Sequence, residues 1–190
     1  MRTDARARRQ KIIATACELY RSQHHDSVTM ENIAEKAGVG IATVYRNFPD
    51  RFSLDMACAH FLFEGVIALE EAAIANFDQE PGATWTSFNR ALIDKGLGSL
   101  VPALVPRSLD ELPPEVSQLR QKTEELTETL INHGKKHGLV HPDIDERTYI
   151  VGLITISRTP MPALAAAAGD LSTTLLGIFL SGIKHGSQPV

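Results

Sequence analysis

The side chains best suited to chemistry in this chain gather on one short predicted helix, residues 41–47. Tyr45 offers a phenol that can reach a phosphate, and Thr43 offers a hydroxyl and a methyl for a phosphate or a thymine edge. Arg46 can reach a guanine edge or a phosphate, and Asn47 is a shorter polar contact. This surface fits the major groove of DNA, and the alternative is a merely solvated helix.

Two short helices folded around one glycine must position that surface, within residues 28–48. Gly38 ends the first helix because the turn needs a positive φ, which glycine adopts easily. Ala34 keeps a small side chain where two helices crossing at roughly 90–120° bring their backbones together. The remaining apolar contacts between the two helices are expected from Ile33, Ala37, Val39 and Val44. The spacing therefore predicts a helix-turn-helix.

The run TMENIAEKAGVGIATVYRNFPDRFSL resembles the DNA-binding segment of TetR-type transcriptional repressors. The resemblance covers about the first third of the chain and combines AGV, TVY, NFP and a basic residue three places after Phe48. It departs at Gly40, where a serine is common, and at Arg51, which replaces the usual lysine and keeps its charge. Because Gly40 has no hydroxyl, we assign it no side-chain contact.

The resemblance implies which residues contact DNA. Thr29, Tyr45 and Arg51 are expected to grip the backbone, and Ala42 and Thr43 to approach bases. Together with the surface described first, the candidate DNA-contacting residues are Thr29, Ile41, Ala42, Thr43, Tyr45, Arg46, Asn47 and Arg51.

Charge supports this interpretation once the chain is divided. The net charge is −4, but residues 1–55 carry nine Lys and Arg against seven Asp and Glu. Residues 1–11 hold four arginines and one lysine against Asp4 alone. This predicts a basic N-terminal arm that neutralises phosphates, and the alternative is a frayed, solvated terminus.

Composition is that of a globular protein, with 43% hydrophobic and 22% charged residues. Apolar runs such as residues 161–169 are short and contain Pro162, so we expect no transmembrane helix. The arginine-rich start is not a signal peptide, and we expect a cytoplasmic protein without a membrane partner. Cys17 and Cys58 lie in helical apolar patterns and are expected to be buried free thiols, not a disulfide or a redox switch.

Helical periodicity continues to the C-terminus, and no strand pattern appears. The fold class is therefore all-α, with about nine helices, divided into a helix-turn-helix domain (1–50) and a larger helical domain (51–190). Thr29, Asp145 and Asp170 are the expected N-caps, and Pro81 fits a first helical turn. The expected helices are 7–23, one starting after Thr29, 41–47, 51–76, one from Pro81 with a break near Val105, 115–137, 145–156 and one from Asp170.

The larger domain resembles the ligand-sensing and dimerisation domain of the same family in length and helical layout. An apolar interior there could hold a small-molecule effector, although such a stripe is more often plain core. The candidate ligand-binding residues are Met56, His60, Phe63, Trp85, Phe88, Leu126 and Leu130. The resemblance makes the last two helices, about 145–158 and 170–185, the homodimer seam, with Gly152, Gly177 and Gly182 as small packing residues.

His133, His137 and His141 recur every four residues and raise the possibility of a metal site. Gly134 and Gly138 are expected to interrupt that helix, so that the third histidine leaves the face. We favour histidines and lysines that complement a helix C-terminus, and predict no metal and no cofactor. No nucleophile motif or phosphate-binding glycine loop is present, and carboxylates such as Glu124, Glu125 and Glu128 fit a solvated face, so we do not expect an enzyme.

The sequence thus predicts a repressor that binds a pseudo-palindromic double-stranded DNA operator as a dimer and is released by a small-molecule effector. Two alternatives remain: a constitutive DNA-binding regulator without an effector, and a helical enzyme or metal-binding protein.

Overall fold

The computed structural model describes residues 2–106, 108–158 and 171–186, with side chains from Asp4 onward. The chain divides into two compact units. The first unit is Met1–Leu62 with Leu100–Ser117, and the second unit is Phe63–Ser99 with Gln118–Val190. The described residues form nine α-helices and two short 3₁₀ helices and contain no strand, which confirms the all-α prediction.

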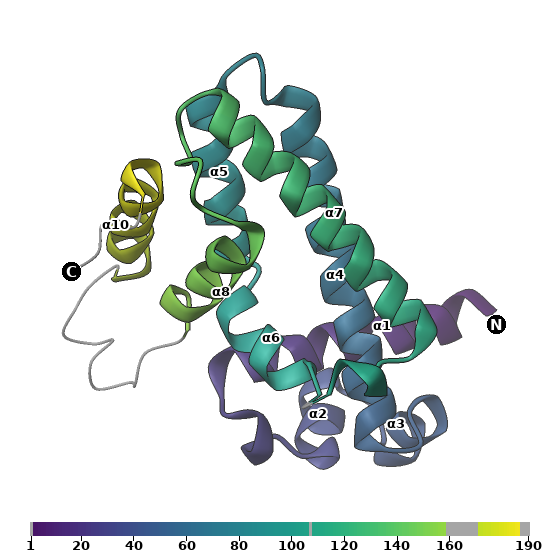
Figure 1. Ribbon diagram of the computed structural model, residues 1–190. Helices are drawn as coiled ribbons and strands as arrows, with labels where there is room; N and C mark the ends of the chain where they lie inside the picture. The colour runs from purple at the N-terminus through teal and green to yellow at the C-terminus, as the bar shows by residue number, and fades with distance from the viewer. Residues whose placement is uncertain (1, 107, 159–170, 187–190) are drawn as a thin grey trace. The chain divides into compact units, whose positions relative to one another are not determined.

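Figure 1 shows the order of the helices along the chain. They are α1 (Arg2–Ser22), α2 (Met30–Ala37), α3 (Ile41–Asn47), α4 (Arg51–Asn76), α5 (Pro81–Asp94), α6 (Leu97–Leu104), α7 (Pro114–Lys136), α8 (Glu146–Ile156) and α10 (Leu171–His185). The 3₁₀ helices are His25–Ser27 and Leu109–Glu111. The bounds of α3 and α4 are those predicted, whereas the predicted cap Asp170 lies outside the described residues.

In the first unit, α1, α2 and α3 enclose a small apolar core. Thr29 begins α2 with a capping box: its Oγ1 accepts from the Asn32 N–H, and the Asn32 Oδ1 accepts from the Thr29 N–H, both at 3.1 Å. Such a cap contributes about 1 kcal/mol. Gly38 ends α2 with φ 64°, as predicted, and is left-handed as the turn into α3 requires. The fully buried side chains of this core include Ile12, Ile33, Val44, Phe48 and Leu54.

The second unit is built around aromatic side chains. Phe77 follows α4, Trp85 and Phe88 lie on α5, and Tyr149 lies on α8; all four are buried. Asp145 caps α8 through the Thr148 N–H at 2.7 Å, and Pro81 occupies the first turn of α5, both as predicted. Helix α10 packs on α8 and α5, and the His141 N–H donates to the Ile183 carbonyl at 2.8 Å.

Two expectations about the helices were wrong. Helix α1 begins at Arg2, so the basic residues form helix instead of an arm. Helix α7 continues through Gly134, and only Gly138, with φ 67°, ends it. A Cβ at Gly134 would lie 2.7 Å from Val140 Cγ2, so this glycine serves a close approach by the returning chain. Helix α4 is long and apolar enough to span a membrane, but core helices share these properties, and its residues Leu62, Val66 and Ile67 are buried in the fold.

Candidate nucleic-acid interface and candidate ligand core

Helix α3 divides into a buried face and an exposed face. Val44 is fully buried, whereas Ile41 and Tyr45 are 38% and 46% exposed. Ala42 and Arg46 are also exposed, and Thr43 and Asn47 are half-buried. The structure therefore places six of the predicted DNA-contacting residues on one short helix.

Polar side chains on α3 are ordered by contacts along the helix. Arg46 Nε donates to the Ala42 carbonyl at 3.1 Å, and Arg46 Nη2 donates to Thr43 Oγ1 at 3.0 Å. Asn47 Nδ2 donates to the Thr43 carbonyl at 2.8 Å. Tyr45 is left as the exposed side chain that extends from this face.

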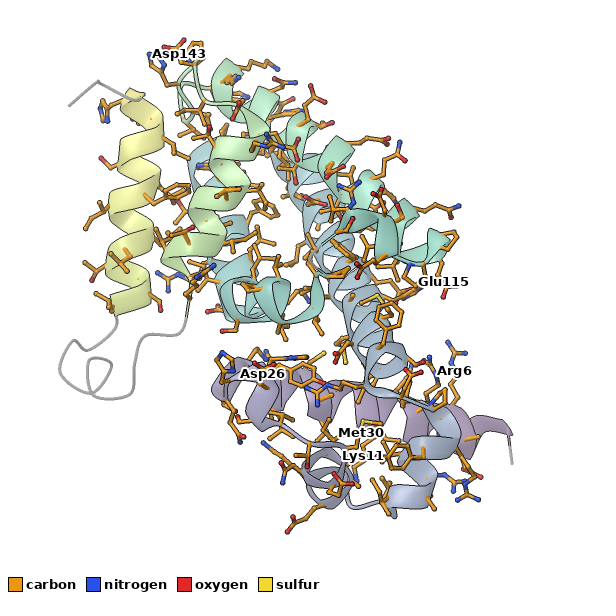
Figure 2. All side chains as sticks on the ribbon, turned by 60° about the horizontal axis from the view of Figure 1, so that its bottom comes forward. Arg6, Lys11, Asp26, Met30, Glu115 and Asp143 are labelled. Atoms are coloured by element: carbon orange, nitrogen blue, oxygen red, sulfur yellow. The ribbon has the colours of Figure 1, made fainter. Side chains whose placement is uncertain are left out.

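Basic side chains gather on α1 of the same unit, where Figure 2 labels Arg6 and Lys11. Arg6, Arg8, Arg9 and Lys11 are exposed, and the Arg9 guanidinium lies 4.8 Å from the centre of the Phe48 ring. The contact between Arg9 and Phe48 joins α1 to the end of α3, because Phe48 directly follows α3. The basic side chains on α1 are therefore fixed in position relative to α3. Such an ordered cluster can neutralise phosphates.

A polar network centred on Asp55 joins the first turn of α4 to α1 and to the segment before α2. Asp55 accepts hydrogen bonds from Tyr20 Oη at 2.8 Å and from Arg51 Nε at 3.1 Å, and its Oδ2 lies 3.0 Å from His25 Nε2. Burial and the neighbouring Asp55 carboxylate raise the pKa of Tyr20 and keep it a donor.

Arg51 uses its whole guanidinium fork inside this network. Besides Nε, Nη1 donates to the Val28 carbonyl, and Nη2 donates to the His25 carbonyl at 3.0 Å. The guanidinium also lies over the Tyr20 ring, 4.8 Å from its centre. Arg51 therefore fixes the segment before α2 to the start of α4, a role that the sequence pattern did not predict. Its phosphate contact stays a prediction.

The two cysteines are free and buried, as predicted. Cys58 Sγ lies 3.8 Å from the Ile13 carbonyl. A hydrogen bond to Cys17 and burial raise the pKa of the Cys58 thiol.

The predicted ligand-binding residues do not all fall in one unit. Met56 and His60 belong to the first unit, and the other five belong to the second. Among those five, Trp85 and Phe88 come together, with ring centroids 6.3 Å apart. Their role in binding a ligand stays a prediction.

A buried polar group that the sequence analysis missed lies in the second unit. Glu70 on α4 is 1% exposed, and its Oε1 accepts a hydrogen bond from Thr127 Oγ1 of α7 at 2.6 Å. On neighbouring elements, Tyr149 Oη donates to Asn89 Oδ1 at 2.9 Å, and Asn89 Nδ2 donates to the Trp85 carbonyl at 2.8 Å. One signal was present: Glu70 follows Val66 and Ile67 at helical spacing, which places a carboxylate on the apolar face of α4.

The three histidines are not arranged as metal ligands. His137 Nε2 lies 2.8 Å from Asp78 Oδ1, and His133 Nδ1 lies 3.7 Å from the same oxygen. The hydrogen bond from His137 lowers the pKa of Asp78. His141 leaves this group, as predicted, and approaches Asp143. No cluster of three metal-ligating side chains occurs in the described ranges.

Helices α8 and α10 pack together and leave apolar residues outside. A Cβ at Gly152 would lie 2.6 Å from Phe179 Cε2, so this glycine allows the two helices to approach closely. Val151 on α8 is 55% exposed and Ile178 on α10 is 64% exposed, while Gly177 and Gly182 border open space.

Two family models match this chain. Residues 12–54 match the model described as bacterial regulatory proteins of the tetR family. Residues 80–185, more than half of the chain, match the model described as the C-terminal domain of SbtR-like transcriptional regulators.

Individual relatives agree with these matches. The HTH-type transcriptional regulator SAUSA300_2515 of Staphylococcus aureus is 37% identical over 54 residues, and the match spans 28% of this chain and 29% of that protein. The TetR regulator SCO0520 of Streptomyces coelicolor has a TM-score of 0.62 and 24% identity, over 92% of this chain and 97% of its own. FadR of Bacillus subtilis, solved with stearoyl-CoA, has a TM-score of 0.60 and 19% identity, over 92% and 98%. These structures share the fold.

Proposed function

We propose a specific role for this chain, which belongs to the TetR family of bacterial transcription regulators: a homodimeric repressor that reads an operator through α3 and is released by a small-molecule effector. Members of the family are DNA-binding transcription factors and not enzymes, which confirms two predictions made from the sequence. The dimer, the operator contacts, the effector and a cytoplasmic location are parts of the proposal.

The exposed face of α3 carries the proposal. This face combines a phenol, a guanidinium and small side chains, and a helix held at a glycine turn is the element that enters a major groove. In our proposal Tyr45 and Thr29 donate to phosphates, and Ala42 and Thr43 face base edges. The Thr29 hydroxyl keeps its proton for this purpose, because Oγ1 is the acceptor in the α2 cap. Ile41, Arg46, Asn47 and Arg51 complete the proposed contacts.

A dimer supplies a second copy of α3 for the other half of the operator. Val151 and Ile178 are large exposed apolar side chains on two helices that pack together, and the same two helices of a second copy would cover them in a four-helix bundle. Two copies of α3 would then enter successive major grooves about 34–36 Å apart on a pseudo-palindromic site.

An effector would act by binding two arrangements of the dimer with different affinity, a coupling of about 1–3 kcal/mol in typical proteins. Helix α4 contributes residues to both units and is our candidate for the coupling element. The stearoyl-CoA in FadR indicates that a fold of this kind can hold a small organic molecule.

The contacts are tested by removing two hydroxyls from α3. The operator is the sequence that the wild-type protein selects from a random DNA library. Fluorescence anisotropy measures the affinity of each protein for this operator. We expect Thr43→Ala combined with Tyr45→Phe to weaken operator binding about 100-fold, because two hydrogen bonds to charged or polar DNA groups contribute about 1.5 kcal/mol each. Thr86→Ala, an exposed threonine on α5, is the matched control and should leave affinity unchanged. Specific binding by the double variant equal to wild type would refute the assignment.

The dimer seam is tested at Ile178. Replacing this exposed side chain by Asp places a charge at the centre of the proposed bundle, and we expect dimer dissociation to become at least 10-fold easier because a buried unpaired charge is costly. Sedimentation equilibrium measures the change, with Thr86→Asp, an exposed residue on α5 and outside the two seam helices, as a comparison for charge alone. A wild-type monomer, or an Ile178→Asp dimer as stable as wild type, would remove the seam from the proposal.

The constitutive alternative differs in one respect: its operator affinity responds to no small molecule. A compound that both raises the melting temperature and weakens operator binding would exclude that alternative.

A further inference from the structure

Glu70 is a carboxyl group in the interior of the second unit, and only one of its two oxygens has a hydrogen-bond partner among the described residues. Thr127 Oγ1 donates to Oε1 at 2.6 Å, whereas Oε2 is buried and has no hydrogen-bond partner among the described residues. An unsatisfied buried polar atom costs about 1–3 kcal/mol, and more if it is charged. Such an atom calls for a functional explanation.

The charges around Glu70 are mainly negative. Glu71 is its neighbour on α4, and Glu146 lies on α8. The negative charges of both carboxylates disfavour ionisation of Glu70. Lys122 on α7 is the cation that counters them, but its Nζ is paired with Glu71 Oε1 at 2.6 Å. Glu146 is itself surrounded by Glu124 and Glu128, and Arg120 is paired with Glu124. This part of the second unit therefore has an excess of carboxylates over cations.

Burial, with smaller contributions from Glu146 and Glu71, raises the pKa of Glu70 to about 8. The group is largely protonated at neutral pH, yet ionising it at pH 7 costs only about 1.4 kcal/mol. A cation placed against Oε2 can supply that energy.

Tyr149 lies near enough to Glu70 for the two groups to interact electrostatically, and Trp85 packs against Tyr149. Burial, with a smaller contribution from Glu70, raises the pKa of Tyr149, and the Tyr149 ring centroid lies 5.4 Å from that of Trp85. Trp85 in turn lies 6.2 Å from Phe77, and its Nε1 is a second buried atom without a hydrogen-bond partner in the described part of the chain. Aromatic faces attract organic cations, and they also cover an apolar body.

We propose that Glu70 Oε2 is the anchor for the cationic nitrogen of a lipophilic amine, whose apolar body lies against Trp85 and Tyr149. The proposal rests on the effector in the proposed function and names its chemical class. Because Glu70 is 1% exposed, an amine reaches Oε2 only when the surrounding side chains separate. Binding therefore favours that opened arrangement, which is what an effector must do.

The experiment uses the full chain without DNA and a panel of arylalkylamines with one to four methylenes between ring and nitrogen. The matched alcohols and carboxylates serve as neutral and anionic counterparts, and calorimetry measures affinity. At pH 8 we expect at least one amine to bind 10-fold or more tightly than its alcohol. Glu70→Gln should abolish this preference, and Glu71→Gln, which alters the neighbouring exposed carboxylate, should retain it.

The pH dependence separates an ionic anchor from apolar binding. If the amine binds ionised Glu70, its affinity should rise roughly 80-fold between pH 6 and pH 8.5, since the ionised fraction rises by that factor around a pKa of about 8. Glu70→Gln should bind equally at both pH values. Glu71, Glu146, Glu124, Glu128, Lys122 and Arg120 are the other charged groups near the site, and all of them are unchanged in that variant.

Three outcomes would overturn the proposal: no amine binds, the amine preference survives in Glu70→Gln, or the carboxylates bind best. Operator binding is measured separately. A protein that binds its selected operator but no amine retains the proposed function without this effector class, whereas one that binds an amine but no specific DNA retains the site and loses the function.

Discussion

Replacing Asp55 by Asn is expected to lower the free energy of unfolding of the first unit by about 3 kcal/mol, because it removes the negative charge and one of the two acceptor oxygens that serve three elements. Tyr20 Oη, His25 Nε2 and Arg51 Nε all lie within 3.1 Å of its carboxylate oxygens. The asparagine amide keeps the shape but turns two N–H donors toward a cluster of donors. The largely covered Arg51 guanidinium then loses its counter-ion.

Urea titration followed by far-UV circular dichroism measures this loss. The sole tryptophan, Trp85, lies in the second unit, so its fluorescence reports that unit in the same titration. Asp26→Asn is the matched control, because Asp26 also lies near His25, at 3.5 Å, but its side chain is 85% exposed. We expect that control to change stability by less than about 0.5 kcal/mol. An Asp55→Asn protein within 1 kcal/mol of wild type would show that the network is not required.

Arg51 shows how far the sequence could lead at this position. A basic residue three places after Phe48 could be predicted as a phosphate contact from the family resemblance alone. Its hydrogen bonds to the Val28 and His25 carbonyls could not, because these two partners lie more than 20 residues earlier in the chain. Pairings of this kind depend on how α1 and α4 pack.

Local signals were reliable where the backbone itself enforces the structure. Gly38, Thr29 and Asp145 determine helix ends through φ or a side-chain cap, and each was predicted correctly. Gly134 was misjudged by the same logic, since a glycine in a helix can also serve a close tertiary approach, here by Val140. The basic N-terminus was misjudged because charge pattern was given more weight than the helix propensity of Ala and Arg.

Glu70 marks the opposite limit. Its spacing from Val66 and Ile67 was a signal that went unused, and a helical pattern alone cannot say whether such a carboxylate turns outward or stays inside. The deciding partner, Thr127, lies 57 residues away on another helix. The structure thus supplies the burial, and burial supplies the raised pKa.

Glu70→Gln is expected to remove a large pH dependence from the stability of the second unit. The folded-state pKa of Glu70 is about 8, against an ordinary value of 4.5, so the folded protein binds more protons than the unfolded chain between these values. Stability contributed by this group is therefore fully present below pH 4.5 and is lost as pH rises through 8. Over pH 5 to pH 8 the loss amounts to about 3 kcal/mol for wild type.

Urea titrations followed by Trp85 fluorescence at pH 5, 6.5 and 8 measure the difference between wild type and Glu70→Gln, so that other titrating groups cancel. The variant should gain on wild type steadily over this range and be the more stable protein at pH 8, since its amide never has to be ionised in the core. Glu71→Gln, which removes an exposed partner of Lys122, should track wild type within about 0.5 kcal/mol at every pH. Parallel curves for Glu70→Gln and wild type would mean that Glu70 is ionised and solvated in the folded protein. The same observation would remove the physical basis for an amine anchor, because a carboxylate already in water gains little from a cation.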